Sequence, residues 1–312
     1  GTPSLFHEAG IFMDAHSILE SGLISDAARR KHGPAEIALC LAAVHDLGED
    51  NGLTSGHLDD WLTARARRDG FFTEVQTAAR TKRIIDATCA GLERLTYKRN
   101  GVFIHGEDLN LYHDVLRDDP YSLIIKFLDR IKNLATMLPL LQNPENPDRM
   151  TGGFTLRQQQ TYLDRTEMLF SVRDMAKEAI QKYPDLKDLF KALDDTLKVM
   201  YRISRLQAHN LEMAGKGEGN GPYKPAFSSL GQLADLSGEI RSSERLFCSV
   251  PPGFHSLSML AGRIEKQPHM HDDEEGLEVI HRIREESAKG MKAFARKEQR
   301  YSVPPLRSFA FS

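Results

Sequence analysis

Apolar residues recur three and four positions apart through long segments of this sequence, and this spacing constrains the fold more than any other feature. The spacing places apolar side chains on one face of an α-helix, whereas a half-buried β-strand alternates apolar and polar residues. Runs of alternating β-branched residues bounded by tight turns are scarce. The sequence therefore predicts an all-α protein.

Two segments are apolar enough to form central, buried helices. The first, residues 35–47, begins just after Pro34, a residue that is favoured at the start of a helix. His45 and Asp46 lie at its end. The second segment is residues 121–141. A helix that is apolar on all sides is buried in a protein core, so we expect both segments to lie inside the fold.

A chain of 312 residues is long enough for one large helical domain with an appendage, since domains commonly contain ~100–200 residues. We expect a domain over residues 1–213, followed by a glycine- and proline-rich linker or loop over residues 214–225. A C-terminal extension of residues 226–312, helical or partly irregular, would complete the chain. Further helical spacing lies in residues 156–182, 185–213 and 274–295.

The overall charge and the cysteines exclude several functional classes. The formal net charge of −3 does not indicate binding to nucleic acid or to an anionic membrane, so we expect a small-molecule partner. No apolar stretch approaches the ~20 residues of a membrane span. The three cysteines are far apart and form no CxxC pair, which favours a reducing cytoplasm over a disulfide framework or zinc knuckle. These features leave the oligomeric state open.

The strongest chemical signal is the segment from His45 to Asp50, His-Asp-Leu-Gly-Glu-Asp, which contains four ionisable groups. If the helix continues, His45 faces the same side as Glu49, and Asp46 the same side as Asp50, because residues four apart stack. Burying these charges without a cation would cost several kcal/mol per group, so we expect a divalent metal. The alternative interpretation is a helix-end pair followed by two solvated carboxylates.

The second apolar helix contains a matching set of charged and polar residues. Lys126, Asp129 and Asn133 share one helical face, and Arg130 is adjacent to Asp129. Apolar residues surround them in the sequence, and an acidic side chain in such a setting needs a partner. We therefore expect Asp129 to belong to the same site as the His-Asp pair.

Together the motifs His-Asp-x-x-Glu-Asp and Ile-Lys-x-x-Asp-Arg-x-x-Asn resemble the hydrolase domain of the RelA/SpoT family, including its small stand-alone hydrolases. The similarity extends over roughly residues 10–185. It implies an HD-domain helical bundle that hydrolyses the 3′-pyrophosphate of guanosine tetra- or pentaphosphate, releasing GDP or GTP and pyrophosphate. It also implies Mn(II) as the metal, with another divalent ion as the alternative.

The resemblance implies roles for individual residues. The implied metal ligands are an upstream histidine, His45, Asp46 and Asp129. Glu49 and Asp50 are implied to position the attacking water. The predicted substrate contacts are Lys98, Arg99, Lys126, Arg130 and Asn133, with Asn133 near the nucleoside. Ordinary surface charge is the alternative interpretation for Lys98 and Arg99.

The upstream histidine has three candidates, His7, His16 and His32. His32 lies in a basic turn beside Gly33, too near His45 in the sequence to come from a separate packed helix. His16 lies further upstream, just ahead of the apolar Ile18, and best matches the histidine-containing helix of the family. We therefore predict His16 as the ligand.

Three departures from the family pattern bear on the function. The Arg-Lys-x-Gly segment that contacts the guanine nucleotide is not recognisable before His16. The interval between His45 and Asp129 is longer than we expect for compact members, which predicts an insertion within residues 51–118. No α/β synthetase pattern follows residue 213. Two alternatives therefore stay open, a phosphohydrolase for another nucleotide or phosphodiester and a non-enzymatic nucleotide-binding regulatory module.

Overall fold

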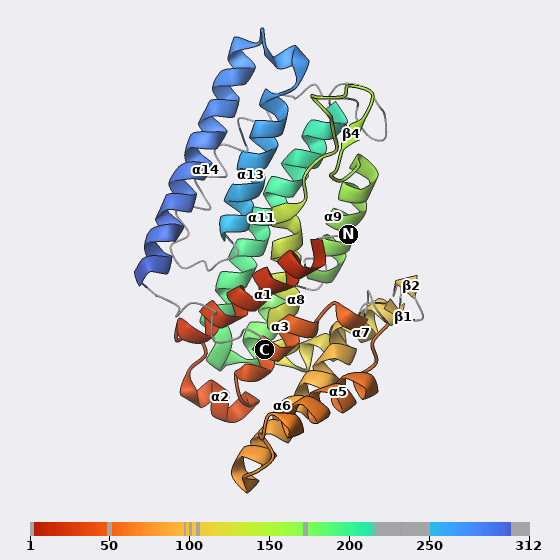
Figure 1. The fold of residues 1–312 in the computed structure, drawn as a ribbon, viewed down its shortest axis with the longest axis vertical. Coiled ribbons are helices and arrows are strands. Elements are labelled where there is room, and N and C mark those ends of the chain that lie inside the picture. Colours follow the sequence, from red (N-terminus) through yellow and green to blue (C-terminus); the bar gives the residue numbers. More distant parts are fainter. Residues whose placement is uncertain are drawn as a thin grey trace. The chain divides into compact units, whose positions relative to one another are not determined.

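The computed structural model describes residues 3–48, 52–96, 98–99, 102–103, 107–170, 174–213, 215, 232 and 250–300. Regular structure within these residues is almost entirely helical, which confirms the predicted all-α fold (Figure 1). The α-helices are α1 (Pro3–Glu20), α2 (Asp26–His32), α3 (Glu36–Val44), α5 (Ser55–Arg68), α6 (Val75–Leu95), α7 (Glu107–Arg117), α8 (Pro120–Thr136), α9 (Leu156–Phe170), α10 (Met175–Lys182), α11 (Lys187–Met213), α13 (Val250–Glu265) and α14 (Glu274–Arg300). Short 3₁₀-helices are η1 (Pro184–Leu186) and η2 (Pro268–Met270).

Two short antiparallel strand pairs accompany the helices. They are β1 (Lys98–Arg99) with β2 (Val102–Phe103), and β3 (Leu141–Gln142) with β4 (Met150–Thr151). The helix predicted over residues 121–141 is too long, because α8 ends at Thr136 and β3 begins at Leu141. Pro139 follows, and proline has no backbone N–H to donate and disfavours the helical conformation at the residue before it. The chain turns there into a bridge between Pro139 and Phe154.

The predicted helix over residues 156–182 is also divided. α9 ends at Phe170, and α10 begins at Met175. Asp174, in the left-handed conformation with φ 46°, precedes α10 and accepts a hydrogen bond from the backbone N–H of Lys177. Aspartate adopts this conformation more readily than most residues, and its side chain caps a helix start. A local cap thus begins a new helix where the apolar spacing continues.

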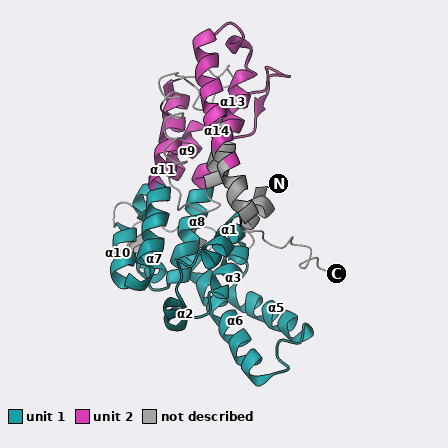
Figure 2. Cartoon of the chain, turned by 90° about the vertical axis from the view of Figure 1, so that its left-hand side faces the viewer, with its two compact units in different colours: residues 1–132, 166–197 teal, residues 133–165, 198–312 magenta. Residues whose placement is uncertain are grey.

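The chain divides into two compact units, residues 1–132 with 166–197 and residues 133–165 with 198–312 (Figure 2). This division differs from the predicted boundary after residue 213. Within the second unit, the β3–β4 segment is bonded to the C-terminal part of the chain, because the guanidinium of Arg263 donates to Thr151 Oγ1 at 2.9 Å. Residues before and after the predicted linker therefore form one unit.

The C-terminal extension of the sequence contains two long helices, α13 and α14, which pack side by side (Figure 1). Only the second of them was predicted. The buried residues of α13 include Leu260, Ala261 and Ile264, and those of α14 include Ile280 and Ile283. Their spacing of one, three and four residues gives each helix one apolar face. The extension is thus helical over most of its described residues.

The core of the first unit is built around α8, in which every residue from 120 to 131 is buried. The ring of Phe127 lies 4.7 Å from that of Phe170 and 6.3 Å from that of Phe190. α3 is buried along one face, which includes Ile37, Leu41 and Val44, and it packs against α1 and α6. The two segments predicted as central helices are therefore both central in this unit.

The interval in which an insertion was predicted contains α5, α6, α7 and the β1–β2 pair. α5 and α6 form a helical hairpin, side by side in Figures 1 and 2. Leu58, Ile85 and Leu92 from this hairpin share a buried cluster with Val44 at the end of α3. This cluster attaches the hairpin to the helix that leads to the His-Asp pair.

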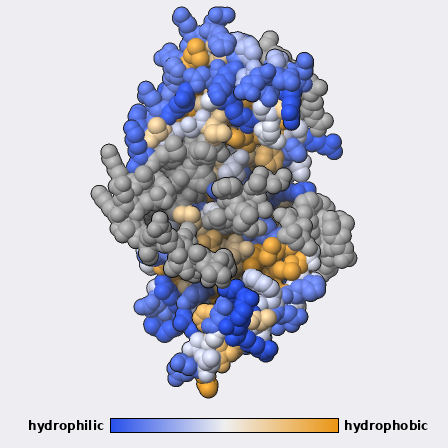
Figure 3. Space-filling view, in the orientation of Figure 1, coloured by the Kyte–Doolittle hydropathy of each residue, from blue (hydrophilic) through white to orange (hydrophobic). Residues whose placement is uncertain are grey.

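The surface is mostly hydrophilic over the described part of the face in Figure 3, with smaller apolar areas between. Some of the exposed apolar residues belong to the α5–α6 hairpin, where Trp61 is 61% exposed. Within the described ranges, no helix combines the length and the apolar character that a membrane span requires.

The first unit also contains a pH-sensitive contact between α2 and η1. His32 Nε2 lies 2.8 Å and Lys31 Nζ 3.2 Å from the carboxylate of Asp185. Burial opposes ionisation of Asp185, but its own backbone N–H and these two side chains outweigh burial and lower its pKa. A carboxylate with a lowered pKa stabilises the folded state above its unfolded pKa, and this stability is lost as the pH falls through the folded value.

We therefore expect Asp185→Asn to lower the free energy of unfolding at neutral pH by about 1.5–3 kcal/mol, the contribution of a hydrogen bond to a charged group. The difference from wild type should shrink below about pH 4, where the unfolded carboxyl group is protonated. Urea unfolding between pH 3 and 7 measures it. Asp195→Asn, at an exposed position of α11, is the control. An equal difference at every pH would contradict the assignment to the Asp185 carboxylate.

Candidate metal centre

His45 follows the last residue of α3, so the helix predicted over residues 35–47 ends slightly earlier. The imidazole is 4% exposed, and its Nδ1 lies 2.9 Å from the carbonyl oxygen of Ala42. A carbonyl can only accept, so Nδ1 must carry the proton that it donates. In the neutral ring, this leaves the lone pair on Nε2. Metal-binding histidines are commonly oriented by a hydrogen bond of this kind.

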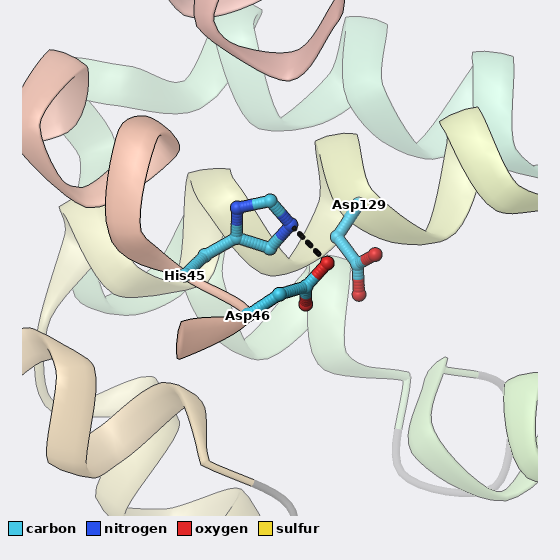
Figure 4. Close-up of side chains that lie close together, drawn as sticks. All are labelled: His45, Asp46 and Asp129. Atoms are coloured by element: carbon cyan, nitrogen blue, oxygen red, sulfur yellow. Dashed lines mark ion pairs between the residues drawn. The ribbon is translucent and has the colours of Figure 1, made fainter. Parts of the chain in front are cut away.

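Asp46 and Asp129 complete a compact group with His45 (Figure 4). The Nε2 atom of His45 lies 3.1 Å from Oδ2 of Asp46. Asp129 approaches from the middle of α8 and is 5% exposed. One donor atom from each of the three residues lies within 4.8 Å of the others. The fold thus joins two motifs that are far apart in the sequence.

The donor set fits a divalent transition metal. Two donor atoms on one such ion lie at most about 4.4 Å apart, because each bond is about 2.0–2.2 Å long. The three side chains therefore need only small adjustments to share an ion. One imidazole and two carboxylates suit Mn(II), Fe(II) or Zn(II), and three protein ligands leave positions for water or substrate.

Charges around the group are closely balanced. The ammonium of Lys126 lies 3.3 Å from the Asp129 carboxylate, and both side chains are buried. Burial lowers the pKa of His45, but the hydrogen bond to Asp46 and the charge of Asp129 outweigh burial, so the pKa is raised overall. The buried guanidinium of Arg130 lies 3.5 Å from Thr166 Oγ1. A buried site with two carboxylates attracts cations, and the neighbouring Lys126 and Arg130 offset part of that charge.

The structure does not bring His16 into this group. Its imidazole is 35% exposed and lies 3.8 Å from the carboxylate of Glu20. His32 pairs with Asp185 as described above. The side chain of His7 lies outside the described residues. Among the described residues, the metal-binding group contains one histidine, where the resemblance implied two.

Of the remaining predicted residues, the structure describes the side chain of Asn133 but not those of the other four. Asn133 lies one turn after Asp129 on α8 and is half-buried. Glu49 and Asp50 lie outside the described residues. Lys98 and Arg99 form β1, but their side chains also lie outside the described part. The roles predicted for these residues therefore stay predictions.

Gly48 is a residue of this region that the sequence did not single out. A Cβ atom at this position would lie 2.5 Å from Thr96 Oγ1 and 3.5 Å from Leu92 Cδ1. The hydroxyl of Thr96 is held in place, because it donates to the carbonyl oxygen of Leu92 at 2.8 Å. The close approach of residue 48 to the end of α6 thus requires glycine. The only signal in the sequence was a glycine within the ionisable motif.

We expect Gly48→Ala to lower the free energy of unfolding by about 1–3 kcal/mol, the usual cost of overpacking. Thr96→Ala removes the opposing hydroxyl and should cost about 1 kcal/mol for the lost hydrogen bond. In the double variant the added methyl group has room, so its destabilisation should be smaller than the sum of the two. A double-mutant cycle by denaturant unfolding measures this coupling. Strict additivity would show that the contact imposes no constraint.

A comparison of the chain with protein-family models, with curated proteins and with solved structures finds no match. The case for this site therefore depends on its own chemistry. The observations that support it are the burial of His45 and Asp129, the hydrogen bond that orients the imidazole, and the convergence of three donor atoms from the end of α3 and the middle of α8.

Proposed function

We propose that this chain is a divalent-metal-dependent phosphohydrolase that holds its ion with His45, Asp46 and Asp129. The convergence of these three donors is the observation that carries the proposal. Buried carboxylates are costly unless a cation or a hydrogen-bond network balances them. A divalent ion supplies that balance and is also the usual activator of water in phosphate hydrolysis.

The residues around the proposed ion would have different roles in hydrolysis. When bound, the ion acidifies water or polarises a phosphate oxygen. His45 is kept in one orientation by its hydrogen bond to Ala42. Lys126 and Arg130 bring positive charge that offsets the charge of a phosphorylated substrate. Glu49, three residues after Asp46, supplies a carboxylate to orient the water and take its proton.

For the substrate, we propose the 3′-pyrophosphate of guanosine tetra- or pentaphosphate, acted on in the cytoplasm. The support is the resemblance of both motifs to the RelA/SpoT hydrolases. The second candidate is another nucleotide or a phosphodiester. Two observations favour it, the missing Arg-Lys-x-Gly segment and the position of His16 outside the metal group. Both candidates use the same metal centre.

The test is metal analysis followed by a substrate panel. The purified chain is stripped with a chelator, reloaded with Mn(II), and assayed with guanosine tetraphosphate, dinucleotides, cyclic dinucleotides and nucleoside monophosphates. We expect one bound Mn(II) per chain. Pyrophosphate should be released from guanosine tetraphosphate only by the Mn(II)-loaded protein. Hydrolysis of another member of the panel, to a phosphate monoester or to free phosphate, would favour the second candidate. Binding of nucleotide without turnover would favour a regulatory module and contradict the enzyme.

A further inference from the structure

Lys126 and Asp129 form a pair inside the most buried helix of the first unit. They are three positions apart on α8, and their side chains are 7% and 6% exposed. The 3.3 Å distance places the ammonium directly against Oδ2 of Asp129. An ammonium group leaves water at high cost, so this lysine depends on a nearby negative charge.

The same carboxylate belongs to the metal-binding group. Asp129 lies with His45 and Asp46 in the set whose donor atoms are within 4.8 Å of one another. The ammonium of Lys126 and a bound divalent ion would therefore both interact with the carboxylate of Asp129. Like charges repel strongly in a buried site, so each cation weakens the hold of Asp129 on the other.

A count of formal charges gives the direction of the effect. With a neutral imidazole, Asp46, Asp129, Lys126 and the neighbouring Arg130 together carry 0, and a divalent ion changes this to +2. Without the lysine the same two values are −1 and +1. Lys126 therefore lowers the attraction of the centre for a cation, and makes the loaded centre more attractive to an anion.

We propose that Lys126 is a built-in counter-ion of the metal centre. It neutralises Asp129 before the ion binds, keeps the affinity for the ion moderate, and adds to the attraction of the loaded centre for a phosphate group. This inference rests on the proposed function, since it requires that a metal binds at His45, Asp46 and Asp129. This role differs from that of a purely structural ion pair. If the pair were only structural, removal of Lys126 would leave the metal affinity unchanged or would lower it by loosening the site.

The test compares Lys126→Met, Lys126→Arg and wild type in the full chain by calorimetric titration with Mn(II). We expect Lys126→Met to bind Mn(II) roughly tenfold more tightly or better, because a buried like charge is removed. Lys126→Arg keeps the charge and should bind as wild type does. Lys82→Met is the matched control, since Lys82 also pairs with an acid on its own helix, Asp86, but at the surface. It should leave the affinity unchanged.

Two further measurements keep the test informative if Lys126→Met is unstable without metal. Its melting temperature should rise more on addition of Mn(II) than that of wild type, because the ion takes over the role of the lost ammonium. Binding of inorganic phosphate to the Mn(II)-loaded protein should weaken. If Lys126→Met binds Mn(II) as tightly as wild type or more weakly, while wild type binds Mn(II), the counter-ion role of Lys126 is overturned. Absence of Mn(II) binding in wild type would instead overturn the proposed function.

Discussion

Asp129→Asn is expected to weaken Mn(II) binding by roughly a hundredfold or more, and to remove measurable turnover with it, since even a lost outer-shell partner costs about 10–100-fold. Asparagine keeps the shape of the side chain, but its amide carries no charge and is a poor ligand for a divalent ion. The position is 5% exposed in the middle of α8. Calorimetric titration with Mn(II) measures the change directly.

The same substitution should also destabilise the protein, because the ammonium of Lys126 would lose its carboxylate. Breaking a buried ion pair on one side costs about 3–5 kcal/mol. Circular dichroism and denaturant unfolding therefore accompany the titration. Asp114→Asn on α7 is the control, since Asp114 pairs with Arg117 at a half-exposed position. A folded Asp129→Asn protein that binds Mn(II) as tightly as wild type would contradict the assignment of Asp129 as a ligand.

The parts of this site that the sequence predicts are those with a strong local signal. His45 and Asp46 end an apolar run, and Asp129 interrupts another. Charged residues inside apolar helices are costly to bury, so they are seldom there without a partner. α8 and one face of α3, the helix that leads to His45, are buried as predicted, and the three donor atoms lie together.

The position of His16 shows what helical spacing leaves open. The buried residues of α1 include Ile11, Ala15 and Ile18, which lie four and three apart. His16 lies off this stripe, next to Ala15, and so points toward a more exposed side of the helix. The motif comparison selected His16 because it best matches the histidine-containing helix of the family, whereas the apolar period of α1 places it beside the buried stripe.

Other features were missed because they depend on contacts that are distant in the sequence. The requirement for glycine at position 48 comes from Thr96, at the end of a different helix. The β3–β4 pair and α13 are joined by the hydrogen bond from Arg263 to Thr151, which lie far apart along the chain. Neither constraint leaves a local periodic signal. The docking of remote segments had to come from the structure.

Glu49→Gln is expected to separate catalysis from metal binding. The glutamine amide cannot accept a proton, so turnover should fall by about 10²–10⁴, the range that a positioned general base contributes. Binding of Mn(II) should stay near the wild-type value, since the proposed ligands are His45, Asp46 and Asp129. Single-turnover assays with the substrate identified by the panel, together with Mn(II) titration, measure the two effects separately.

The control for this substitution is Glu36→Gln, the same isosteric change in the first turn of α3, where the carboxylate pairs with Arg80 at the surface. It should alter neither turnover nor Mn(II) affinity. Loss of Mn(II) in Glu49→Gln would make Glu49 a ligand, and the centre would then hold its ion with three carboxylates. Unchanged turnover would remove Glu49 from the chemistry and leave Asp50 as the carboxylate of the motif that accepts the proton from water.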